Sequence, residues 1–361
     1  MTVQSRYKPG CPVFELTLNC NLNCIHCGSS AGKKFKDELT TKEAIKICHD
    51  MAKIGSGGVA LMGGEVLLRK DWDIISKEIK NLGMKLSIVT NGYFNPKNII
   101  SKLIKLEVDS VTVGLDGIKK THNYIRGAED AFDKTINFIK LLKNEGLDVC
   151  PITTFHKINI NEFFEIRELI LSKGLDWSVN YASLIGRFPK NLLLNEEEYY
   201  ELTLLIAASQ KKYSKNRVIA GHNMGFNARF VPNLTLYSKW TGCIAGKLSL
   251  GIKSNGDVNG CLPLPKNFTE GNVKKKSLIK IWNDPNSFRY SREFKEEDIK
   301  GFCSTCKYKK SCKGGCTLNS VTITGNIHND PYCLYRIEQE IFGRNIEEKI
   351  REIKECHSNN L

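Results

Sequence analysis

Short apolar runs alternate with segments in which apolar residues recur every three or four positions over roughly the first 215 residues. The short runs are typical of buried strands, and the longer periodicity is typical of amphipathic helices. The pattern predicts strands at 13–18, 59–62, 86–89, 110–115, 149–154 and 177–181. It predicts helices at 41–54, 72–82, 96–106, 131–144, 162–172 and 196–213.

The first predicted helix has a defined start and end in the sequence. Thr40 and Glu43 form a capping-box pattern, in which each side chain accepts a hydrogen bond from the backbone of the other residue. Gly55 ends the periodic run, as glycine commonly does just beyond a helix.

The alternation of strands and helices defines the fold class. Strand–helix–strand units with right-handed crossovers build a parallel sheet that can curl into a barrel. Six units are too few for a closed eight-fold barrel, so we predict an α/β protein with a partial (βα)6 TIM-like barrel. Reactive residues on such barrels lie in the loops after the strands, which here are 19–27, 63–65, 90–92 and 116–117.

Beyond residue 216 the pattern becomes irregular and rich in Gly, Asn and Cys. Helical periodicity returns over 334–354. We therefore predict a barrel domain at 1–215, a linker at 216–242, a small cysteine-rich domain at 243–335 and a C-terminal helix at 336–361.

Composition and charge exclude several classes of protein. No apolar run approaches the roughly 18 residues that cross a bilayer, and the first ten residues lack the apolar segment of a signal peptide. We therefore expect a cytoplasmic protein with no membrane partner. The net charge is +14, but the lysines are spread along the chain with few aromatic residues among them. Nucleic-acid binding is disfavoured, although a basic surface would attract an acidic segment of a peptide.

The chain has 14 cysteines, and a reducing compartment argues against disulfides. Ligation of metal is the better explanation. Ten of the cysteines fall in two spacing motifs, and the remaining four are Cys11, Cys48, Cys150 and Cys356.

The first motif is a C-x3-C-x2-C run directly after the first predicted strand, formed by Cys20, Cys24 and Cys27. Three thiolates so close together can ligate three irons of a 4Fe-4S cubane and leave the fourth iron open to a substrate. The alternative is a zinc site with His26 as the fourth ligand, which the motifs further along the chain disfavour.

This motif and those that follow it resemble the radical S-adenosylmethionine superfamily over nearly the whole chain. The resemblance implies that Cys20, Cys24 and Cys27 hold a catalytic cluster whose open iron binds S-adenosylmethionine. An electron from the reduced cluster then cleaves the cofactor, and a 5′-deoxyadenosyl radical abstracts hydrogen from an unactivated position. The family also implies an electron donor such as flavodoxin or ferredoxin.

Gly63, Gly64 and Glu65 resemble the GGE motif of this family. The resemblance implies that the glycines let the backbone approach the cofactor and that Glu65 accepts a hydrogen bond from its methionyl ammonium. Thr90 and Asn91 resemble the segment near the ribose.

Three further residues are candidates for the cofactor pocket. Asp116 follows the fourth predicted strand and resembles another segment of that pocket. Arg126 could pair with the cofactor carboxylate or cap a loop, and Arg187 is a similar candidate.

The second motif contains seven cysteines and resembles the SPASM extension of radical S-adenosylmethionine proteins, which binds two auxiliary iron-sulfur clusters of the 4Fe-4S type. A zinc ribbon is disfavoured because seven thiols overfill one zinc site and underfill two. Two cubanes need eight ligands, so one position is open or filled by another group. The resemblance assigns the outer cluster to Cys303, Cys306, Cys312 and Cys333, and the inner cluster to Cys243, Cys261 and Cys316.

Proteins with this cysteine arrangement are mainly maturases of ribosomally made peptides. The resemblance therefore favours an oxidoreductase-type enzyme that modifies a peptide by crosslinking, excision or related C–H chemistry. The alternative is a dehydrogenase or cofactor-biosynthesis enzyme acting on a small molecule. A non-catalytic iron-sulfur or nucleic-acid-binding module would leave Glu65 without a purpose.

Nineteen residues precede Cys20, which leaves no room for the N-terminal leader-binding domain of many peptide maturases. We expect a leader to bind a separate protein or the barrel itself, or the substrate to have none. The peptide is expected to lie on the open face of the barrel, between the first cluster and the inner auxiliary cluster.

Overall fold

The computed structural model describes residues 5–224 and 227–357. Its described strands form one sheet in the order β10-β9-β8-β1-β2-β3-β4-β5-β6-β7. The strands are β1 (Val13–Glu15), β2 (Gly58–Met62), β3 (Lys85–Thr90), β4 (Ser110–Gly114), β5 (Val149–Phe155), β6 (Trp177–Tyr181), β7 (Val218–Ala220), β8 (Gly251–Ile252), β9 (Asp257–Asn259) and β10 (Thr269–Asn272).

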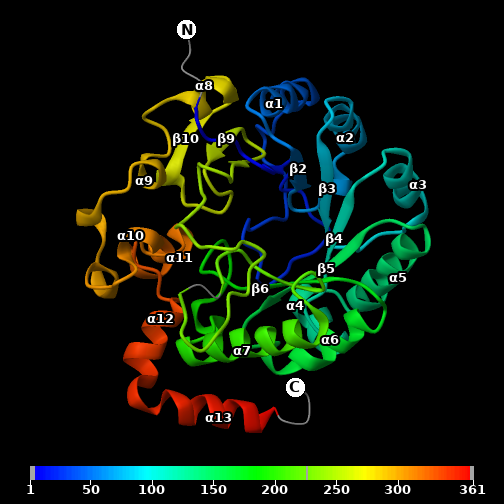
Figure 1. Ribbon diagram of the computed structural model, residues 1–361. Coiled ribbons are helices and arrows are strands. Elements are labelled where there is room, and N and C mark those ends of the chain that lie inside the picture. Colours follow the sequence, from blue (N-terminus) through cyan, green and yellow to red (C-terminus); the bar gives the residue numbers. More distant parts are fainter. Residues whose placement is uncertain (1–4, 225–226, 358–361) are drawn as a thin grey trace.

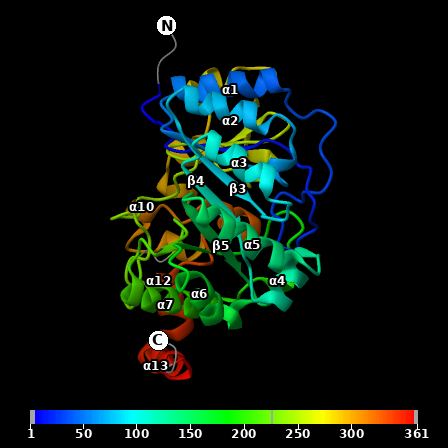
Figure 2. The same cartoon turned by 90° about the vertical axis from the view of Figure 1, so that its right-hand side faces the viewer.

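The helices of the first part of the chain lie outside the curved sheet, from the top of Figure 1 round its right-hand rim to the bottom, and several of them lie in front of the strands in Figure 2. They are α1 (Thr41–Lys53), α2 (Trp72–Asn81), α3 (Lys97–Lys105), α4 (Lys119–Arg126), α5 (Ala131–Asn144), α6 (Phe163–Leu171) and α7 (Glu196–Tyr213). The later helices are α8 (Leu278–Asn283), α9 (Arg289–Arg292), α10 (Lys309–Cys312), α11 (Thr317–Asn319), α12 (Leu334–Arg336) and α13 (Ile346–Cys356).

The predicted partial barrel is confirmed. Strands β1 to β7 pair in parallel with their neighbours, and a helix that was predicted from periodicity follows each of the first six. Fully buried side chains such as Phe14, Leu61 and Trp177 fill the space between sheet and helices. The capping box at α1 is also present, since Glu43 N donates to Thr40 Oγ1 and Thr40 N donates to Glu43 Oε2.

The sheet extends beyond the six predicted strands. The short strand β7 lies inside the segment predicted as a linker and pairs in parallel with β6. Helix α4 was also not predicted, because it has only eight residues and most of them are polar. The first strand is shorter than predicted, ending at Glu15 instead of residue 18.

The cysteine-rich segment joins the barrel through its first strand. β8 pairs in parallel with β1, with Val13 opposite Gly251, and β9 and β10 continue the sheet in antiparallel fashion. A Cβ at Gly251 would lie 2.4 Å from Leu262 Cα, so the close packing at this join requires glycine. The sheet of the barrel therefore continues without interruption into this segment, on the left in Figure 1.

The predicted C-terminal helix is not continuous. A π-helical turn, Ile337–Phe342, follows α12, and Gly343 then adopts a positive φ of 50° before α13 begins. Glycine adopts this conformation readily, and it interrupts the helix. Residues 358–361 of the predicted helix lie outside the described residues. Over the described part of the chain, every helix is too short or too polar to cross a bilayer.

Candidate active site

The thiols of the first cysteine motif meet in one cavity. Cys20, Cys24 and Cys27 lie in the loop after β1 and line a cavity of about 280 Å³. The segments that follow β2, β3 and β4 complete its wall, because the carboxyl ends of neighbouring parallel strands meet at the same edge of the sheet. The predicted residues that share this wall are Gly63, Gly64, Thr90, Asn91, Asp116, Arg126 and Arg187.

Each of the three thiols accepts one N–H hydrogen bond. The Asn91 side-chain amide lies 3.8 Å from the Cys20 sulfur, and the Arg126 guanidinium lies 3.9 Å from the Cys24 sulfur. The backbone N–H of Ala31 donates to the Cys27 sulfur at 3.2 Å. Donors of this kind stabilise thiolates and tune the potential of an iron-sulfur cluster. The donor set therefore fits a cluster held by three thiolates.

Burial makes two of these thiols poor acids in the absence of a metal. It raises the pKa of Cys20 to about 11, and it raises the pKa of Cys24 although the Arg126 guanidinium opposes the rise. Thiols that ligate metal must lose their protons, so cluster assembly is expected to release protons here.

The two glycines of the GGE motif let two chain segments pack closely. A Cβ at Gly63 would lie 2.4 Å from Thr17 O, and one at Gly64 would lie 2.6 Å from Asn19 O. The backbone N–H of Gly64 also donates to Thr17 O at 2.7 Å. The structural need for glycine at both positions is therefore the approach of the strand end to the cysteine loop.

Glu65 lies behind the cavity wall and is fully buried. Its carboxylate accepts hydrogen bonds from the backbone N–H groups of Leu67 and Asn91 at 3.1 and 2.8 Å and from the hydroxyl of Thr90 at 3.0 Å. Burial raises the pKa of Glu65 to about 7 against these bonds. In the described conformation this carboxylate fixes Thr90 and Asn91, which themselves line the cavity.

Asp116 and Arg126 form a buried ion pair at the base of the cavity, with 2.5 Å between Arg126 Nη2 and Asp116 Oδ2. Burial alone would raise the pKa of Asp116, but the guanidinium of Arg126 holds it well below its ordinary value. His26 Nε2 lies 3.3 Å from the same carboxylate. Burial lowers the pKa of His26 and lowers that of His122 to about 3, so both rings are neutral near pH 7. Arg126 is thus paired with Asp116 inside the protein.

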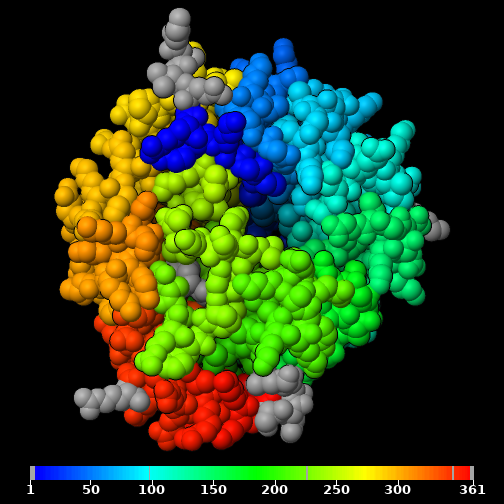
Figure 3. Space-filling model, in the orientation of Figure 1, coloured from blue at the N-terminus to red at the C-terminus, as the bar shows by residue number. Residues whose placement is uncertain are grey.

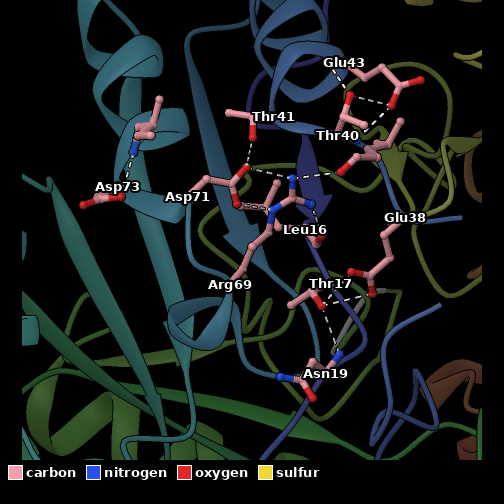
Figure 4. Close-up of polar contacts among 12 residues, drawn as sticks. Leu16, Thr17, Asn19, Glu38, Thr40, Thr41, Glu43, Arg69, Asp71 and Asp73 are labelled. Carbon is pink, nitrogen blue, oxygen red and sulfur yellow. Dashed lines mark hydrogen bonds and ion pairs between the residues drawn. The ribbon is translucent and has the colours of Figure 1, made fainter. Parts of the chain in front are cut away.

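Hydrogen bonds and an ion pair hold the residues that directly follow β1 in place. The sequence patterns did not predict these contacts. Arg69 donates to Leu16 O at 2.6 Å and also pairs with Asp71 (Figure 4). Glu38 accepts hydrogen bonds from the backbone N–H of Leu18 and from the hydroxyl of Thr17. These contacts fix the first residues of the cysteine loop, and no periodic or motif signal marks either charged residue.

The seven later thiols separate into two groups in space. Burial raises the pKa of Cys316 well above its ordinary value, and repulsion from Cys243 and Cys261 adds to the rise. The same repulsion from Cys243 acts on Cys261, whose pKa is raised to about 12, chiefly by burial. Cys243, Cys261 and Cys316 therefore interact electrostatically with one another.

The other four thiols act on one another in the same way. Burial raises the pKa of Cys303 to about 12, and the neighbouring Cys333 and Cys306 add to it. The pKa of Cys312 is likewise raised to about 12 by burial, with Cys303 as a contributor. These repulsions act within the two sets of thiols that the resemblance assigns to the inner and outer clusters, and the assignment itself stays a prediction.

Asp330 connects the two groups. Its buried carboxylate accepts hydrogen bonds from the backbone N–H groups of Cys316 and Tyr332, at 2.8 and 3.0 Å. It also contributes to the raised pKa values of Cys303 and Cys333, after burial and neighbouring thiols. Neither spacing nor periodicity indicates this residue.

A second cavity, of about 720 Å³, connects the barrel with the cysteine-rich segment. Cys27 and Cys261 both line it. Its walls are mainly apolar, with Val13, Ile185, Ile244, Leu248, Leu262 and Pro263 among them. The two cavities adjoin, because four residues line both: Cys27, Gly28, Met62 and Gly63.

The larger cavity is not confined to the strand ends. Gly10 and Cys11, which precede β1, line it together with Tyr237. Figure 3 shows a hollow in this face, bordered by the blue N-terminal segment and by the yellow-green segment that follows α7. The expected cleft between the first and inner thiol groups is therefore present, and it extends along the barrel.

Lys247, Lys313, Arg292 and Arg6 form a group of interacting cations, and Lys247 is the neighbour in the chain of a residue that lines the cavity. Lys247 precedes the cavity residue Leu248, and its Nζ lies 3.4 Å from Cys243 O. Burial lowers the pKa of Lys247, and repulsion from Lys313, Arg292 and Arg6 lowers it further. An anionic group at this edge of the cavity would relieve that repulsion.

Two family models match the chain in the regions described above. The model of the radical SAM superfamily matches residues 14–170, and that of an iron-sulfur cluster-binding domain, SPASM, matches residues 243–307.

Three relatives span most of the chain. The AdoMet-dependent heme synthase of Methanosarcina barkeri is 30% identical over 338 residues, covering 90% of this chain and 95% of that protein. The Fe-coproporphyrin III synthase of the same organism is 24% identical and covers 93% of this chain and 90% of its own length. The mycofactocin maturase MftC of Mycolicibacterium smegmatis is 27% identical, with coverages of 85% and 78%.

A solved structure has the same fold. The SuiB protein of Streptococcus suis, bound to S-adenosylmethionine, superposes with a TM-score of 0.71 at 20% identity, covering 90% of this chain and 76% of that one.

Proposed function

This chain belongs to the radical SAM superfamily and carries an SPASM domain, and we propose that it abstracts hydrogen from a side-chain carbon of a carboxylate-bearing tetrapyrrole. The relatives favour the small-molecule alternative over the peptide substrate expected from the cysteine spacing. The heme synthase and the Fe-coproporphyrin III synthase are both named for tetrapyrrole products and match nine-tenths of the chain. The relative named as a maturase matches less of it.

The larger cavity is the observation that carries this proposal. A tetrapyrrole is a flat apolar ring with charged carboxylates at its edge. The cavity of about 720 Å³ offers mainly apolar walls for such a ring. The cations around Lys247 stand next to the cavity residue Leu248, where carboxylates could pair with them.

The adjoining smaller cavity is the proposed cofactor site. S-adenosylmethionine bound to a reduced 4Fe-4S cluster supplies a 5′-deoxyadenosyl radical. Cys20, Cys24 and Cys27 would hold the cluster, with the N–H groups of Asn91 and Arg126 directed at two of the sulfurs. Met62 and Gly63 line both cavities, so the cofactor site opens directly onto the substrate site.

We propose that the two later thiol groups hold two auxiliary 4Fe-4S clusters. The inner group would have three cysteine ligands, and Cys261 from this group lines the substrate cavity. A cluster at this position would be close enough to the substrate to accept an electron from it, which would make net oxidation possible.

The test uses the reconstituted enzyme under anaerobic conditions with S-adenosylmethionine, dithionite and iron coproporphyrin III. We expect 5′-deoxyadenosine to form in fixed proportion to a porphyrin of altered mass, measured by chromatography and mass spectrometry. Leu248→Glu should suppress the porphyrin product, because it places a negative charge in the apolar wall and would repel the carboxylates of the ring. Leu236→Glu is the matched control, since Leu236 is similarly exposed, 57% against 50%, and does not line the cavity.

If a short peptide encoded beside this gene changes mass with S-adenosylmethionine while the porphyrin remains unchanged, the tetrapyrrole proposal is wrong and the substrate is a peptide.

A further inference from the structure

His222 occupies a position that the cofactor chemistry does not use. It lies in the turn directly after β7, the last parallel strand of the barrel. Its side chain is exposed and lines the larger cavity, which it shares with Cys27 and Cys261. Residues directly after barrel strands are those that such folds use for chemistry.

The turn that presents His222 is fixed on both sides. The N–H of Gly221 donates to Val179 O at 3.0 Å, and the N–H of Met224 donates to Gly221 O at 3.0 Å. The side chain of Asn223 donates to the hydroxyl of Tyr181 at 2.9 Å. A Cβ at position 221 would lie 2.4 Å from Asn180 Oδ1, so glycine is needed for the turn to follow the strand so closely. The backbone of His222 is thus held in place by its neighbours.

The imidazole itself is available. Its ring makes no hydrogen bond or ion pair with any residue in the described ranges 5–224 and 227–357. Protein atoms around the cavity desolvate the ring and lower the pKa of His222, so it is neutral near pH 7. A neutral imidazole has a nitrogen lone pair, which can ligate iron without the loss of a proton.

Three other potential iron ligands line the cavity in addition to the thiols assigned to clusters. They are Cys11, Tyr237 and the thioether of Met62. Burial raises the pKa of the Cys11 thiol, which disfavours the thiolate needed for ligation. A tyrosine must likewise lose its hydroxyl proton to bind iron, as it does in catalase. His222 and Met62 are the two that ligate in their neutral form, and imidazole suits iron better than the soft thioether does, so His222 is the favoured ligand.

We propose that His222 ligates the iron of an iron-bearing tetrapyrrole in the larger cavity. This inference rests on the proposed function and adds to it a protein ligand for the iron of the substrate. The ring would be held at its centre by His222 and at its edge by the cations near Leu248. Two such anchors would fix which side chain of the ring faces the cavity wall formed by Met62 and Gly63, where the cofactor site opens.

The test compares two probes, ferric iron coproporphyrin III and metal-free coproporphyrin III, titrated into reconstituted enzyme without reductant. Visible absorption and electron paramagnetic resonance report the iron's ligation, and fluorescence quenching reports binding of the metal-free ring. In His222→Ala we expect the affinity for the iron form to fall at least about tenfold. The spectrum should lose its histidine-ligated signature, and added imidazole should restore it. Affinity for the metal-free ring should change little. Cys11→Ser, in the same cavity, is the matched control and should keep the wild-type spectrum.

The binding measurements separate a failure of the His222 assignment from a failure of the proposed function. If wild-type enzyme binds both rings and His222→Ala leaves the iron spectrum unchanged, the role of His222 is refuted while the proposed function stands. If the wild-type enzyme binds neither ring, the proposed function itself fails. If Cys11→Ser alone removes the iron signature, the ligand is Cys11 and the assignment to His222 is wrong.

Discussion

Replacing Glu65 with glutamine should reveal the protonation of a fully buried carboxyl beneath the cofactor site. Burial raises the pKa of Glu65 to about 7 from an ordinary 4.5, although three hydrogen-bond donors oppose the rise. Between these two values the folded protein keeps a proton on this carboxyl that the unfolded chain has released. Folding therefore takes up a proton, and a stability contribution that is complete below pH 4.5 is lost as the pH rises through about 7.

The size of the effect follows from the two pKa values. Between about pH 5 and about pH 8, this carboxyl alone should lower the free energy of unfolding by about 2 to 3 kcal/mol. Glutamine does not titrate, so Glu65→Gln should lack this part of the pH dependence. One of the two backbone N–H groups, of Leu67 or Asn91, loses its acceptor oxygen in the variant. That loss costs about 1 to 3 kcal/mol and is the same at every pH.

Urea unfolding of the metal-free, reduced protein at several pH values measures this difference. Other buried carboxyls, such as those of Glu15 and Asp330, titrate in both proteins and cancel in the comparison. Thr90→Val is the control, because it removes a hydrogen bond to Glu65 but keeps the carboxyl, so the pH dependence should persist. Equal pH dependence in wild type and Glu65→Gln would refute the raised pKa.

Three further predictions concern the clusters and the ion pair. Cys27→Ala should abolish formation of 5′-deoxyadenosine, measured by chromatography, because a cluster ligand is lost. Cys312→Ala should still cleave some S-adenosylmethionine but should form no product. Normal cleavage of S-adenosylmethionine in Cys27→Ala would disprove the site. Anaerobically reconstituted protein should contain about twelve irons per chain if all three clusters are cubanes, and iron analysis that finds one cluster's worth would contradict the assignment of the later thiols. Arg126→Ala should lower the free energy of unfolding by about 3 to 5 kcal/mol, because Asp116 would be left as an unpaired buried charge. Lys134→Ala, at an exposed ion pair, should leave the urea midpoint nearly unchanged, and equal effects of the two would show that the buried pair is not stabilising.

The sequence alone determined the elements that repeat with a regular period. The six strand–helix units of the barrel and the start of α1 at Thr40 are local features, written in residues a few positions apart. It also located much of the candidate site. The loops after parallel strands share one edge of the sheet, so residues as distant as Cys20, Thr90 and Asp116 could be expected in one cavity, and they line it together.

Details within that site depended on packing. Glu65 carries the acidic position of a known motif, yet its carboxylate is directed at Thr90 and Asn91 behind the wall. Arg126 was a candidate for binding the cofactor, and the fold pairs it with Asp116. A motif specifies which residue types are present, whereas burial and neighbouring charges decide which contacts each one makes.

Only the tertiary structure decided how the two cysteine regions face each other. β8 has two residues, too few for any periodic signal. Its position is set by hydrogen bonding to β1, which lies far earlier in the sequence. This pairing lets Cys261 line the same cavity as Cys27, and the turn after β7 adds His222 to its lining. Contacts between segments so far apart depend on the shape of the whole sheet, and no local pattern of hydrophobic and polar residues encodes them.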